Sequence, residues 1–287
     1  MKQYKNLLKK TLDNGVRKNN RTGVDTIGII GAHMQFDMAK GFPMVTLKKT
    51  YWKKAVAEML GFLRGYDNAE DFRKLGCDVW DQNANENKQW LSNPNREGLD
   101  DLGRIYGVQA RDWEQPWFNS MDDITNSIDQ LKNVYEDLKA GKDNRREIVT
   151  HWNPGDIDKM SLPPCHLLYQ FSIQGGYLHL TMYQRSCDMA LGVPFNIVGY
   201  SWLLMVMAQI TGLKAGVFNH FLTDVHIYEN HLMGVHEMLK REPMKLPTMN
   251  INPDIKTLED LETWVTVDDF AVYGYESHPA IKLEMAV

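Results

Sequence analysis

The chain has 287 residues, of which 43% are hydrophobic and 24% are charged, and its formal net charge is -5. This composition is that of an ordinary globular protein, and the length allows one large domain or two smaller ones. The acidic balance argues against broad binding to nucleic acid or to an anionic membrane, although a local basic pocket is compatible with it.

The cysteine content indicates a reducing compartment. Three cysteines, at positions 77, 165 and 187, are too few and too scattered for a disulfide framework, and an odd number leaves a free thiol. Residues 1–10 (MKQYKNLLKK) lack the apolar core of a signal peptide. The longest apolar stretch, 195–212, is interrupted by three polar residues and falls short of a membrane span. We therefore expect a cytoplasmic protein with a buried helix at 195–212.

The first half of the chain shows both helical and extended patterns. Apolar residues at helical spacing predict helices over 2–15 and 51–64, and strict alternation over 30–38 predicts a strand with its even-numbered residues on the apolar face. Residues 82–100 are polar and rich in turn formers, which indicates a loop or a surface insertion. An amphipathic stripe predicts a further helix over 121–141.

The second half is dominated by extended patterns. A strand is expected over 146–152 and a hairpin over 166–185, turning at Gly175 and Gly176 because such turns need positive φ. Beyond the buried helix we expect a short strand, a helix near 228–241, and strands near 248–251 and 268–275. No repeat or linker divides the sequence, so we predict one α+β domain over 1–287 with a large mixed, mostly antiparallel β-sheet.

The stretch LPPCHLLYQ (162–170) fixes a thiol directly before a predicted strand. A cysteine becomes a strong nucleophile when cationic neighbours lower its pKa. The adjacent His166 is a poor partner for Cys165, because neighbouring residues on a strand point to opposite faces. Locally, two alternatives remain: a buried structural cysteine, and a Cys–His hydrolase that takes its histidine from elsewhere.

The stretch YQRSCDMALGVPFN (183–196) suits a nucleotide. Arg185 and Ser186 offer a guanidinium and a hydroxyl, a suitable pair for a phosphate. Asn196 lies just before the apolar helix and has two interpretations. It is either the N-cap of that helix or a group that reads O4 and N3–H of a pyrimidine with its amide.

Three other candidates remain open on local sequence. Arg145 and Arg146 form either a solvated pair or an anion site. His226 and His231 match no standard zinc spacing, and HExxH is absent, so we expect no metal. Glu58 lies at the edge of the apolar stripe of the 51–64 helix, where partial burial would raise its pKa and suit it to proton transfer. Its alternative is a boundary residue whose carboxylate reaches water.

Ten motifs in order resemble the thymidylate synthase family over a match that runs from about residue 20 to the C-terminus. They are RTG (21–23), GFPMVTLKK (41–49), AEMLGFLRG (57–65), VWDQ (79–82), DLGRIYG (101–107), NRREIV (144–149), LPPCH (162–166), QRSCDMALGVPFN (184–196), DVHIYENH (224–231) and a terminal MAV. No single motif is decisive, but the order and spacing together are specific.

The resemblance implies a nucleotide site. Five catalytic residues are expected: Cys165, Glu58, Tyr106, Arg185 and Asp188. Cys165 would add to C6 of dUMP, and Tyr106 would help to deprotonate C5. At the phosphate the resemblance implies Arg21, Arg185 and Ser186, together with Arg145 and Arg146 from the second subunit of a homodimer. Asn196 would bind the uracil edge, and His226 and Tyr228 the deoxyribose hydroxyl. Asp188 would complete the substrate-binding set. The large sheet is expected at the dimer interface.

The resemblance also implies that 5,10-methylenetetrahydrofolate is the co-substrate. Its expected contacts are Val79, Trp80, Leu191, Gly192 and Phe195, with Asp188 at the pterin, and Ala286 and Val287 closing over it. Closure of the C-terminus would exclude water. The expected partners are therefore dUMP, the folate and a second copy of the chain.

Several positions depart from the family pattern. Leu222 and Thr223 replace a common Gly pair, Arg104 replaces Pro, and the small Gly61 and Ala110 stand where Trp is frequent, which predicts extra room near the site. Two alternatives to synthase activity follow. One is a dUMP hydroxymethylase, in which water rather than hydride captures the methylene intermediate, and the other is a catalytically silent family member.

Overall fold

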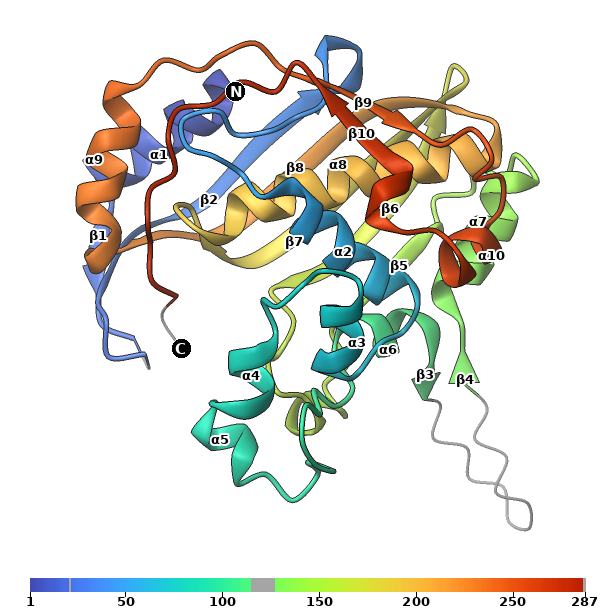
Figure 1. Ribbon diagram of the computed structural model, residues 1–287, viewed down its shortest axis with the longest axis horizontal. Helices are drawn as coiled ribbons and strands as arrows, with labels where there is room; N and C mark the ends of the chain where they lie inside the picture. The colour runs from blue at the N-terminus through green and yellow to red at the C-terminus, as the bar shows by residue number, and fades with distance from the viewer. Residues whose placement is uncertain (21, 115–126, 286–287) are drawn as a thin grey trace.

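The structure is a computed structural model that describes residues 1–20, 22–114 and 127–285. A large sheet lies against a long central helix, and shorter helices surround the pair (Figure 1). The predictions made for Arg21, Ala286 and Val287 lie outside the described residues.

A mixed sheet has six strands in the order β1-β2-β8-β7-β6-β5. The strands are β1 (Val16–Lys18), β2 (Thr26–Asp37), β5 (Ile148–Thr150), β6 (His166–Gln174), β7 (Tyr177–Asp188) and β8 (Lys214–Tyr228). Neighbouring strands are antiparallel except β7 and β8, which are parallel. A parallel pair needs a long crossover, which is here the helix between them. The predicted large, mostly antiparallel sheet is confirmed.

The connections within the sheet follow from local sequence. Gly175 and Gly176 have φ angles of 61° and 81°, and they form the tight turn between β6 and β7 that was predicted. The strand expected to be short after the buried helix is instead β8, with 15 residues. It is long because it pairs with β2 along one edge and with β7 along the other.

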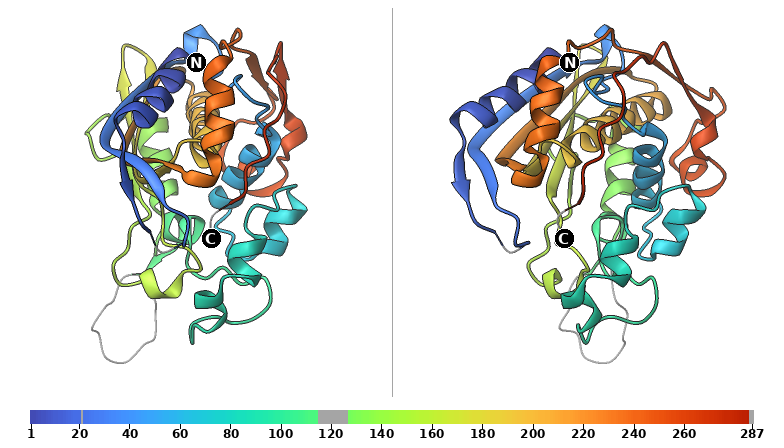
Figure 2. Two further views of the ribbon diagram at one scale, coloured as in Figure 1. Left: turned by 90° about the vertical axis from the view of Figure 1, so that its left-hand side faces the viewer. Right: turned by 60° about the vertical axis from the view of Figure 1, so that its left-hand side comes forward.

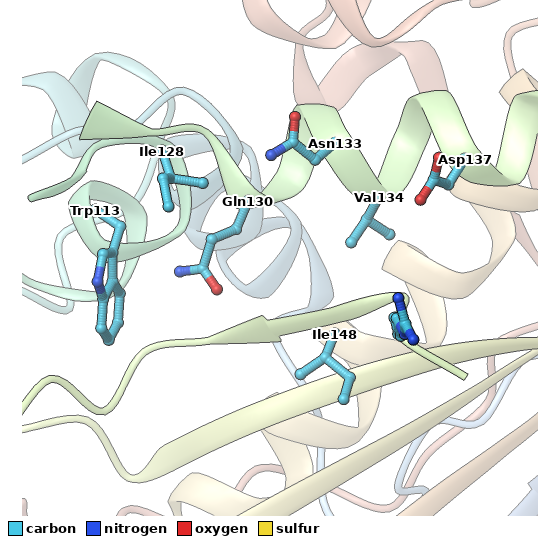
Figure 3. Close-up of a pocket in the computed structure, with 8 residues that line it drawn as sticks. Trp113, Ile128, Gln130, Asn133, Val134, Asp137 and Ile148 are labelled. Atoms are coloured by element: carbon cyan, nitrogen blue, oxygen red, sulfur yellow. The ribbon is translucent and has the colours of Figure 1, made fainter. Parts of the chain in front are cut away.

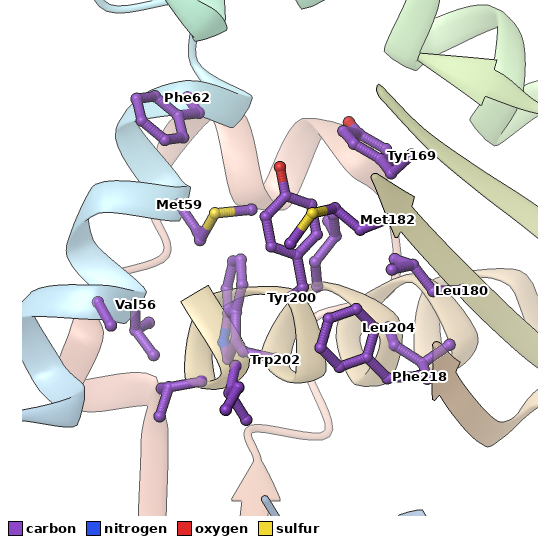
Figure 4. Close-up of a cluster of buried hydrophobic side chains, with 14 of the residues drawn as sticks. Val56, Met59, Phe62, Tyr169, Leu180, Met182, Tyr200, Trp202, Leu204 and Phe218 are labelled. Carbon is purple, nitrogen blue, oxygen red and sulfur yellow. The ribbon is translucent and has the colours of Figure 1, made fainter. Parts of the chain in front are cut away.

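Helix α8 (Gly192–Thr211) is the predicted buried helix. It meets the length and composition of a membrane span, but 78% of its most apolar window is buried inside the protein. It packs against β7 and β8 on one side and against α2 (Trp52–Leu63) on the other. Figure 4 shows Met59 of α2 extending toward Tyr200 of α8 in this core.

The other elements are shorter. The helices are α1 (Lys2–Asn14), α3 (Ala69–Lys74), α4 (Asp81–Asn85), α5 (Lys88–Leu91), α6 (Tyr106–Arg111), α7 (Gln130–Lys139), α9 (Leu232–Lys240) and α10 (Leu258–Thr263). Two small antiparallel ladders pair β3 (Trp113–Glu114) with β4 (Ser127–Ile128), and β9 (Thr248–Ile251) with β10 (Phe270–Tyr273). Single 3₁₀ turns cover Met38–Lys40, Ile157–Lys159, Glu229–His231 and Val267–Asp269.

Three local predictions were wrong in part. Of the helix expected over 121–141, residues 121–126 lie outside the described residues. Within the described part the helix begins at Gln130, where the Asp129 carboxylate caps it by accepting the backbone N–H of Lys132. The polar 82–100 segment contains α4 and α5, and its Trp90 is buried and donates to the Asp101 carbonyl at 2.7 Å. Ile30 was expected on the apolar face of its strand but is 76% exposed, next to Gly31, whose φ of 80° interrupts the regular strand conformation.

The face of the sheet turned away from α8 remains accessible, and Figure 2 shows the sheet from its edge. Large side chains on this face keep about two-fifths of their surface exposed: Ile148 39%, Tyr177 43%, Tyr183 40% and Phe221 43%. Successive strand residues alternate between this face and the core. The outer sheet face, defined by these four residues, therefore carries more apolar surface than a solvated sheet requires.

Gly61 on α2 does not leave the extra room that was predicted from its small size. A Cβ atom placed there would lie 2.3 Å from the Phe72 ring, which occupies the space beside the glycine. Phe72 is fully buried and also contacts the rings of Phe62 and Trp80. A large side chain from α3 thus fills the volume that a larger residue at position 61 would take.

We expect Gly61→Ala to destabilise the protein by roughly 1–3 kcal/mol. An alanine in a helix interior would otherwise stabilise it by about 0.5–1 kcal/mol, so the sign tests the overlap with Phe72. The measurement is urea unfolding at fixed protein concentration. The matched control is Gly98→Ala, where a Cβ meets no atom within 4 Å. A Gly61→Ala variant as stable as the wild type would contradict the close approach.

Candidate active site

Cys165 lies immediately before β6, at the end of the segment Pro163–Pro164, and its free thiol is partly accessible. Its backbone is held from two sides. The Cys165 N–H donates to the Tyr106 hydroxyl at 2.6 Å, and its carbonyl accepts the Arg185 N–H at 2.9 Å. The proline pair restricts the backbone before it. The thiol is therefore presented from a fixed backbone, as a nucleophile requires.

The Arg185 side chain reaches the same segment. Its Nε donates to the Pro164 carbonyl at 2.8 Å and its Nη2 to the Pro163 carbonyl at 3.0 Å. The guanidinium also lies 5.4 Å from the centroid of the Trp152 ring. The structure thus places a cation, twenty residues away in sequence, on the segment that carries Cys165. Its use of the proline carbonyls was not foreseen.

Glu58 adds a carboxyl group to the site. It lies on α2, and burial raises the pKa of its carboxyl to about 7, an effect that the nearby Trp80 indole partly offsets. The Trp80 and Tyr106 rings meet edge-on at 5.9 Å. A connected set therefore runs from Glu58 through Trp80 and Tyr106 to Cys165, with one acid that can exchange a proton near neutral pH.

His166 does not activate the cysteine. It is buried, and its ring packs 5.2 Å from those of Tyr106 and Tyr200. Burial, with the neighbouring His151, lowers the pKa of His166 to about 3, so the ring is neutral at physiological pH. A neutral imidazole provides no cation to stabilise a thiolate. The prediction that His166 is a poor partner for Cys165 is in agreement with this geometry.

The start of α8 carries Asn196. The helix begins at Gly192, so Asn196 lies in its second turn and the N-cap interpretation is wrong. Its Oδ1 accepts a hydrogen bond from Gln184 Nε2 at 2.9 Å. The Asn196 side chain also hydrogen-bonds the His166 side chain, so its partly exposed amide serves side-chain contacts rather than a helix cap.

Asp188 joins the sheet to the same helix. Its carboxylate accepts the backbone N–H groups of Ala190 and Leu191 at 3.0 and 3.2 Å, which fixes the turn that precedes α8. His231 Nδ1 lies 3.7 Å from Asp188, and His231 Nε2 lies 2.7 Å from the Glu284 carbonyl. Burial lowers the pKa of His231, but Asp188 outweighs it and the net direction is upward. The histidine thereby links Asp188 to the C-terminal segment.

The predicted ribose and phosphate residues lie on adjacent strands. Ser186 and Asp188 on β7 pair with Asp224 and His226 on β8. His226 Nδ1 lies 3.0 Å from the Asp224 carboxylate, and its ring meets that of Tyr228 at 5.2 Å. Cys187 of β7 pairs with Val225 of β8. Ser186 precedes this pair by one residue on β7, and His226 follows it by one residue on β8.

Arg145 and Arg146 are not brought to Cys165 within one chain. Both are exposed in the loop before β5, whereas Trp152, beyond the other end of β5, contacts Arg185. Arg146 instead lines a pocket of about 280 Å³ between α7 and β5 (Figure 3). That pocket contains no other residue of the predicted site, and it is distinct from the thiol.

A second pocket, of about 390 Å³, borders the start of α8. Leu191 and Phe195, both predicted folate contacts, line it together with Lys48, Lys49 and residues 280–283. Neither Val79 nor Trp80 is in this lining, and Trp80 lies beside Glu58. The two lysines belong to the motif at 41–49 but were not among the predicted folate contacts.

Three further residues lie at or next to the site but were not predicted from the sequence: Gln184, His220 and Trp152. Each touches a predicted site residue or lies one contact away. No short motif marks them, because strand register and tertiary packing bring them there. Among the described residues, no group of three or more His, Cys, Asp or Glu side chains could hold a metal ion.

The remaining departures have structural partners. Leu222 is buried, and the Thr223 hydroxyl donates to the Tyr183 hydroxyl at 2.6 Å on the outer sheet face. Arg104 pairs with the buried Asp156 at 2.9 Å, and Ala110 is buried in the core. None of these residues contacts Cys165 through any hydrogen bond or ion pair found in the described part of the chain.

The fold and site are those of an enzyme: a partly accessible cysteine is linked through Tyr106 and Trp80 to the carboxyl of Glu58, whose pKa is raised. The sequence profile of the family described as thymidylate synthase matches residues 2–287. The chain is 51% identical to the thymidylate synthases of Histophilus somni (strain 2336) and Haemophilus influenzae (strain KW20 / Rd), and 50% identical to that of Aliivibrio fischeri, each over the full length of both chains. The chain belongs to the thymidylate synthase family.

We expect the pKa of Glu58 to make stability depend on pH with a definite sign. A carboxyl whose pKa rises from 4.5 to about 7 on folding favours the native state when protonated, so this contribution is lost as pH rises from 4.5 through about 7. Glu58→Gln mimics the protonated form. The variant should therefore be more stable than the wild type at pH 8, by roughly 1–3 kcal/mol, and about equal at pH 5.

The measurement is urea unfolding of both proteins at the two pH values. The control is Glu70→Gln on α3, whose carboxylate is exposed. It should give the same small difference at pH 5 and pH 8. An equal stability difference for Glu58→Gln at both pH values would contradict the raised pKa.

Proposed function

We propose that the chain methylates dUMP to dTMP through a covalent adduct of Cys165. The observation that carries the proposal is the fixed cysteine between Tyr106 and Arg185, with Glu58 one contact further away. Membership of the thymidylate synthase family supports the same reaction. 5,10-Methylenetetrahydrofolate supplies the one-carbon unit and the hydride.

The residues have separate roles in this proposal. The Cys165 thiolate adds to C6 of the pyrimidine, which makes C5 a carbon nucleophile. Tyr106 assists removal of the C5 proton after the new carbon–carbon bond has formed. Glu58, with its pKa near 7, holds and moves protons at O4. The buried surroundings of Glu58 and Tyr106 limit the access of bulk water to these steps.

Nucleotide binding is assigned to the two strands and the start of α8. Arg185 and Ser186 bind the phosphate with Arg21, His226 and Tyr228 bind the deoxyribose hydroxyl, and Asn196 reads the uracil edge. Asp188 lies where β7 meets α8 and completes this side of the site. A guanidinium suits a phosphate because it donates two parallel hydrogen bonds.

The folate is assigned to the side of the site that the second pocket borders. Leu191 and Phe195 provide apolar surface there, with Val79, Trp80 and Gly192 nearby in the proposal, and Asp188 hydrogen-bonds the pterin. Lys48 and Lys49 in the same lining complement an anionic ligand. Ala286 and Val287 follow the segment 280–283 and are proposed to close over the ligand.

The proposal includes a homodimer that forms through the outer sheet face and acts in the cytoplasm. Support comes from the partly exposed Ile148, Tyr183 and Phe221 on that face, since large apolar patches mark protein interfaces. It also comes from Arg145 and Arg146, which are exposed and lie away from the cysteine of their own chain. A partner could use both arginines at its phosphate site.

Hydroxymethylation of dUMP is the less favoured function. It shares the early steps and differs only in whether water or hydride captures the methylene group. The relatives from Histophilus somni, Haemophilus influenzae and Aliivibrio fischeri, at 50–51% identity over the full length, are thymidylate synthases. The space predicted beside Gly61, which would have admitted extra water, is filled by Phe72. Product analysis with dUMP and the folate separates the two reactions, since only the synthase yields dihydrofolate.

We expect Cys165→Ser to lose at least about a thousandfold in turnover while its Kd for dUMP changes less than about threefold, because a hydroxyl is a much weaker nucleophile of similar size. The assays are spectrophotometric dihydrofolate formation and calorimetric dUMP titration. Cys187→Ser is the matched control, since its buried Sγ donates to the Gln184 carbonyl at 3.5 Å and Cys187 is not among the predicted site residues. Sustained turnover by Cys165→Ser would rule out the nucleophile assignment.

The shared site is tested with hybrid dimers. Cys165→Ser chains and Arg145→Ala/Arg146→Ala chains are each expected to be nearly inactive alone. Random mixing after reversible unfolding yields one intact site in half of the dimers, so about a quarter of wild-type activity should return. The same mixing with Cys165→Ser and Glu58→Gln chains should restore nothing if both residues act within one chain, because each hybrid site would then lack one of them. Lack of recovery in the first mixture would exclude donation of the arginines across the interface.

A further inference from the structure

We infer that His220 is a positioning residue that determines, through Gln184, which edge of a pyrimidine Asn196 can read. The inference rests on the proposed function, because it deepens the proposed role of Asn196. It assigns a part in substrate choice to a buried histidine that lies outside the set expected from the sequence. Three observations carry the argument: the burial of His220, a directed series of hydrogen bonds, and the chemistry of the amide at its end.

His220 lies on the core side of β8 and is fully buried. In the sheet it is paired with Met34 of β2 and Met182 of β7, and its ring stacks on that of Phe218 at 5.5 Å. These neighbours are apolar. A polar ring in such surroundings is costly unless it makes hydrogen bonds, so the single bond that His220 forms among the described residues is informative.

That bond begins a series whose direction is fixed by chemistry. Gln184 Nε2 lies 2.9 Å from the Ser186 carbonyl, which can only accept, so this atom of Gln184 must be the nitrogen. Gln184 Oε1 therefore faces His220 Nε2 at 2.7 Å, and that ring nitrogen must carry the proton. The same Gln184 nitrogen donates to Asn196 Oδ1 at 2.9 Å. Donation thus runs from His220 to Gln184 to Asn196.

The state of the ring agrees with this direction. Burial, with smaller effects from His166 and His33, lowers the pKa of His220 to about 3, so it is neutral and carries one proton. Nδ1 is buried and has no hydrogen-bond partner in the described part of the chain, which leaves Nε2 as the nitrogen that donates. His220 and the Ser186 carbonyl therefore together keep Gln184 from rotating its amide by half a turn.

The consequence falls on Asn196. With Oδ1 turned toward Gln184, the Asn196 amide presents its N–H₂ group and the second lone pair of Oδ1 to a ligand. These match O4 and N3–H of uracil. Cytosine has a donor at position 4 and an acceptor at N3, so it needs the amide turned over. In that orientation the Asn196 nitrogen would face the Gln184 nitrogen, and two donors would oppose each other.

The experiment measures the affinities for dUMP and dCMP separately from turnover. The proteins are the wild type, His220→Phe, His220→Gln and a control, His236→Phe, which makes the same substitution at an exposed site on α9. Phenylalanine removes the donor, whereas glutamine can keep one near the position of Nε2. Titration calorimetry gives Kd for each nucleotide, and circular dichroism confirms that each variant is folded.

We expect the ratio of Kd for dCMP to Kd for dUMP to fall about tenfold in His220→Phe, as for loss of one discriminating hydrogen bond, and to recover at least partly in His220→Gln. The control should keep the wild-type ratio. An unchanged ratio in a folded His220→Phe variant would overturn the inference, as would equal weakening for both nucleotides, since a merely structural role predicts the latter.

A second measurement uses the wild-type chain, so it decides the question even if a variant does not fold. In protein labelled with ¹⁵N-histidine, the His220 resonances should show the protonated nitrogen at Nε2 and the unprotonated one at Nδ1. The opposite tautomer would overturn the inference. Failure of the proposed function looks different: the wild type would bind dUMP without methylating it, whatever the ratio for His220→Phe.

Discussion

The structure depends on one constraint, the need to cover helix α8 on every side. Its apolar residues leave no polar face, so the helix cannot lie at a surface. The sheet covers one side and α2 the other, and Gly199 allows Met59 to approach so closely that a Cβ there would lie 2.9 Å from its Cγ. This arrangement brings Glu58 of α2 and Asn196 of α8 to the same region as the end of β7, where Arg185 holds the cysteine segment.

Burial of the site also determines which groups carry charge. His151, His166 and His220 are buried, and burial lowers the pKa of each to between about 3 and about 4, so they serve as neutral hydrogen-bonding groups. The same loss of water raises the pKa of Glu58 to about 7 and the pKa of Tyr106 above its usual value. The three histidines are therefore uncharged, and Arg185 is the cation among these groups. The group that exchanges a proton near neutral pH is an acid, Glu58.

The sequence predicted the elements whose apolar period is strong and whose boundaries have local signals, such as α1, α2, α8 and the hairpin at Gly175–Gly176. It failed where partners from other elements decide the outcome. The length of β8 follows from pairing on both edges, and the space beside Gly61 is taken by Phe72. The site was inferred from motif order, because local sequence left Cys165 and Asn196 ambiguous. Gln184 and His220 could not be found in this way, since strand register makes them neighbours.

The distribution of charge explains why such a site would be shared between chains. The net charge is -5, and the cysteine region of one chain uses Arg185 partly to hold the carbonyls of Pro163 and Pro164. A dianionic phosphate needs further cations, yet Arg145 and Arg146 project from the far end of β5. In the proposed dimer, association through the outer sheet face supplies these cations to the partner. Association would then cover apolar surface and complete the anion site in the same step, which links activity to assembly.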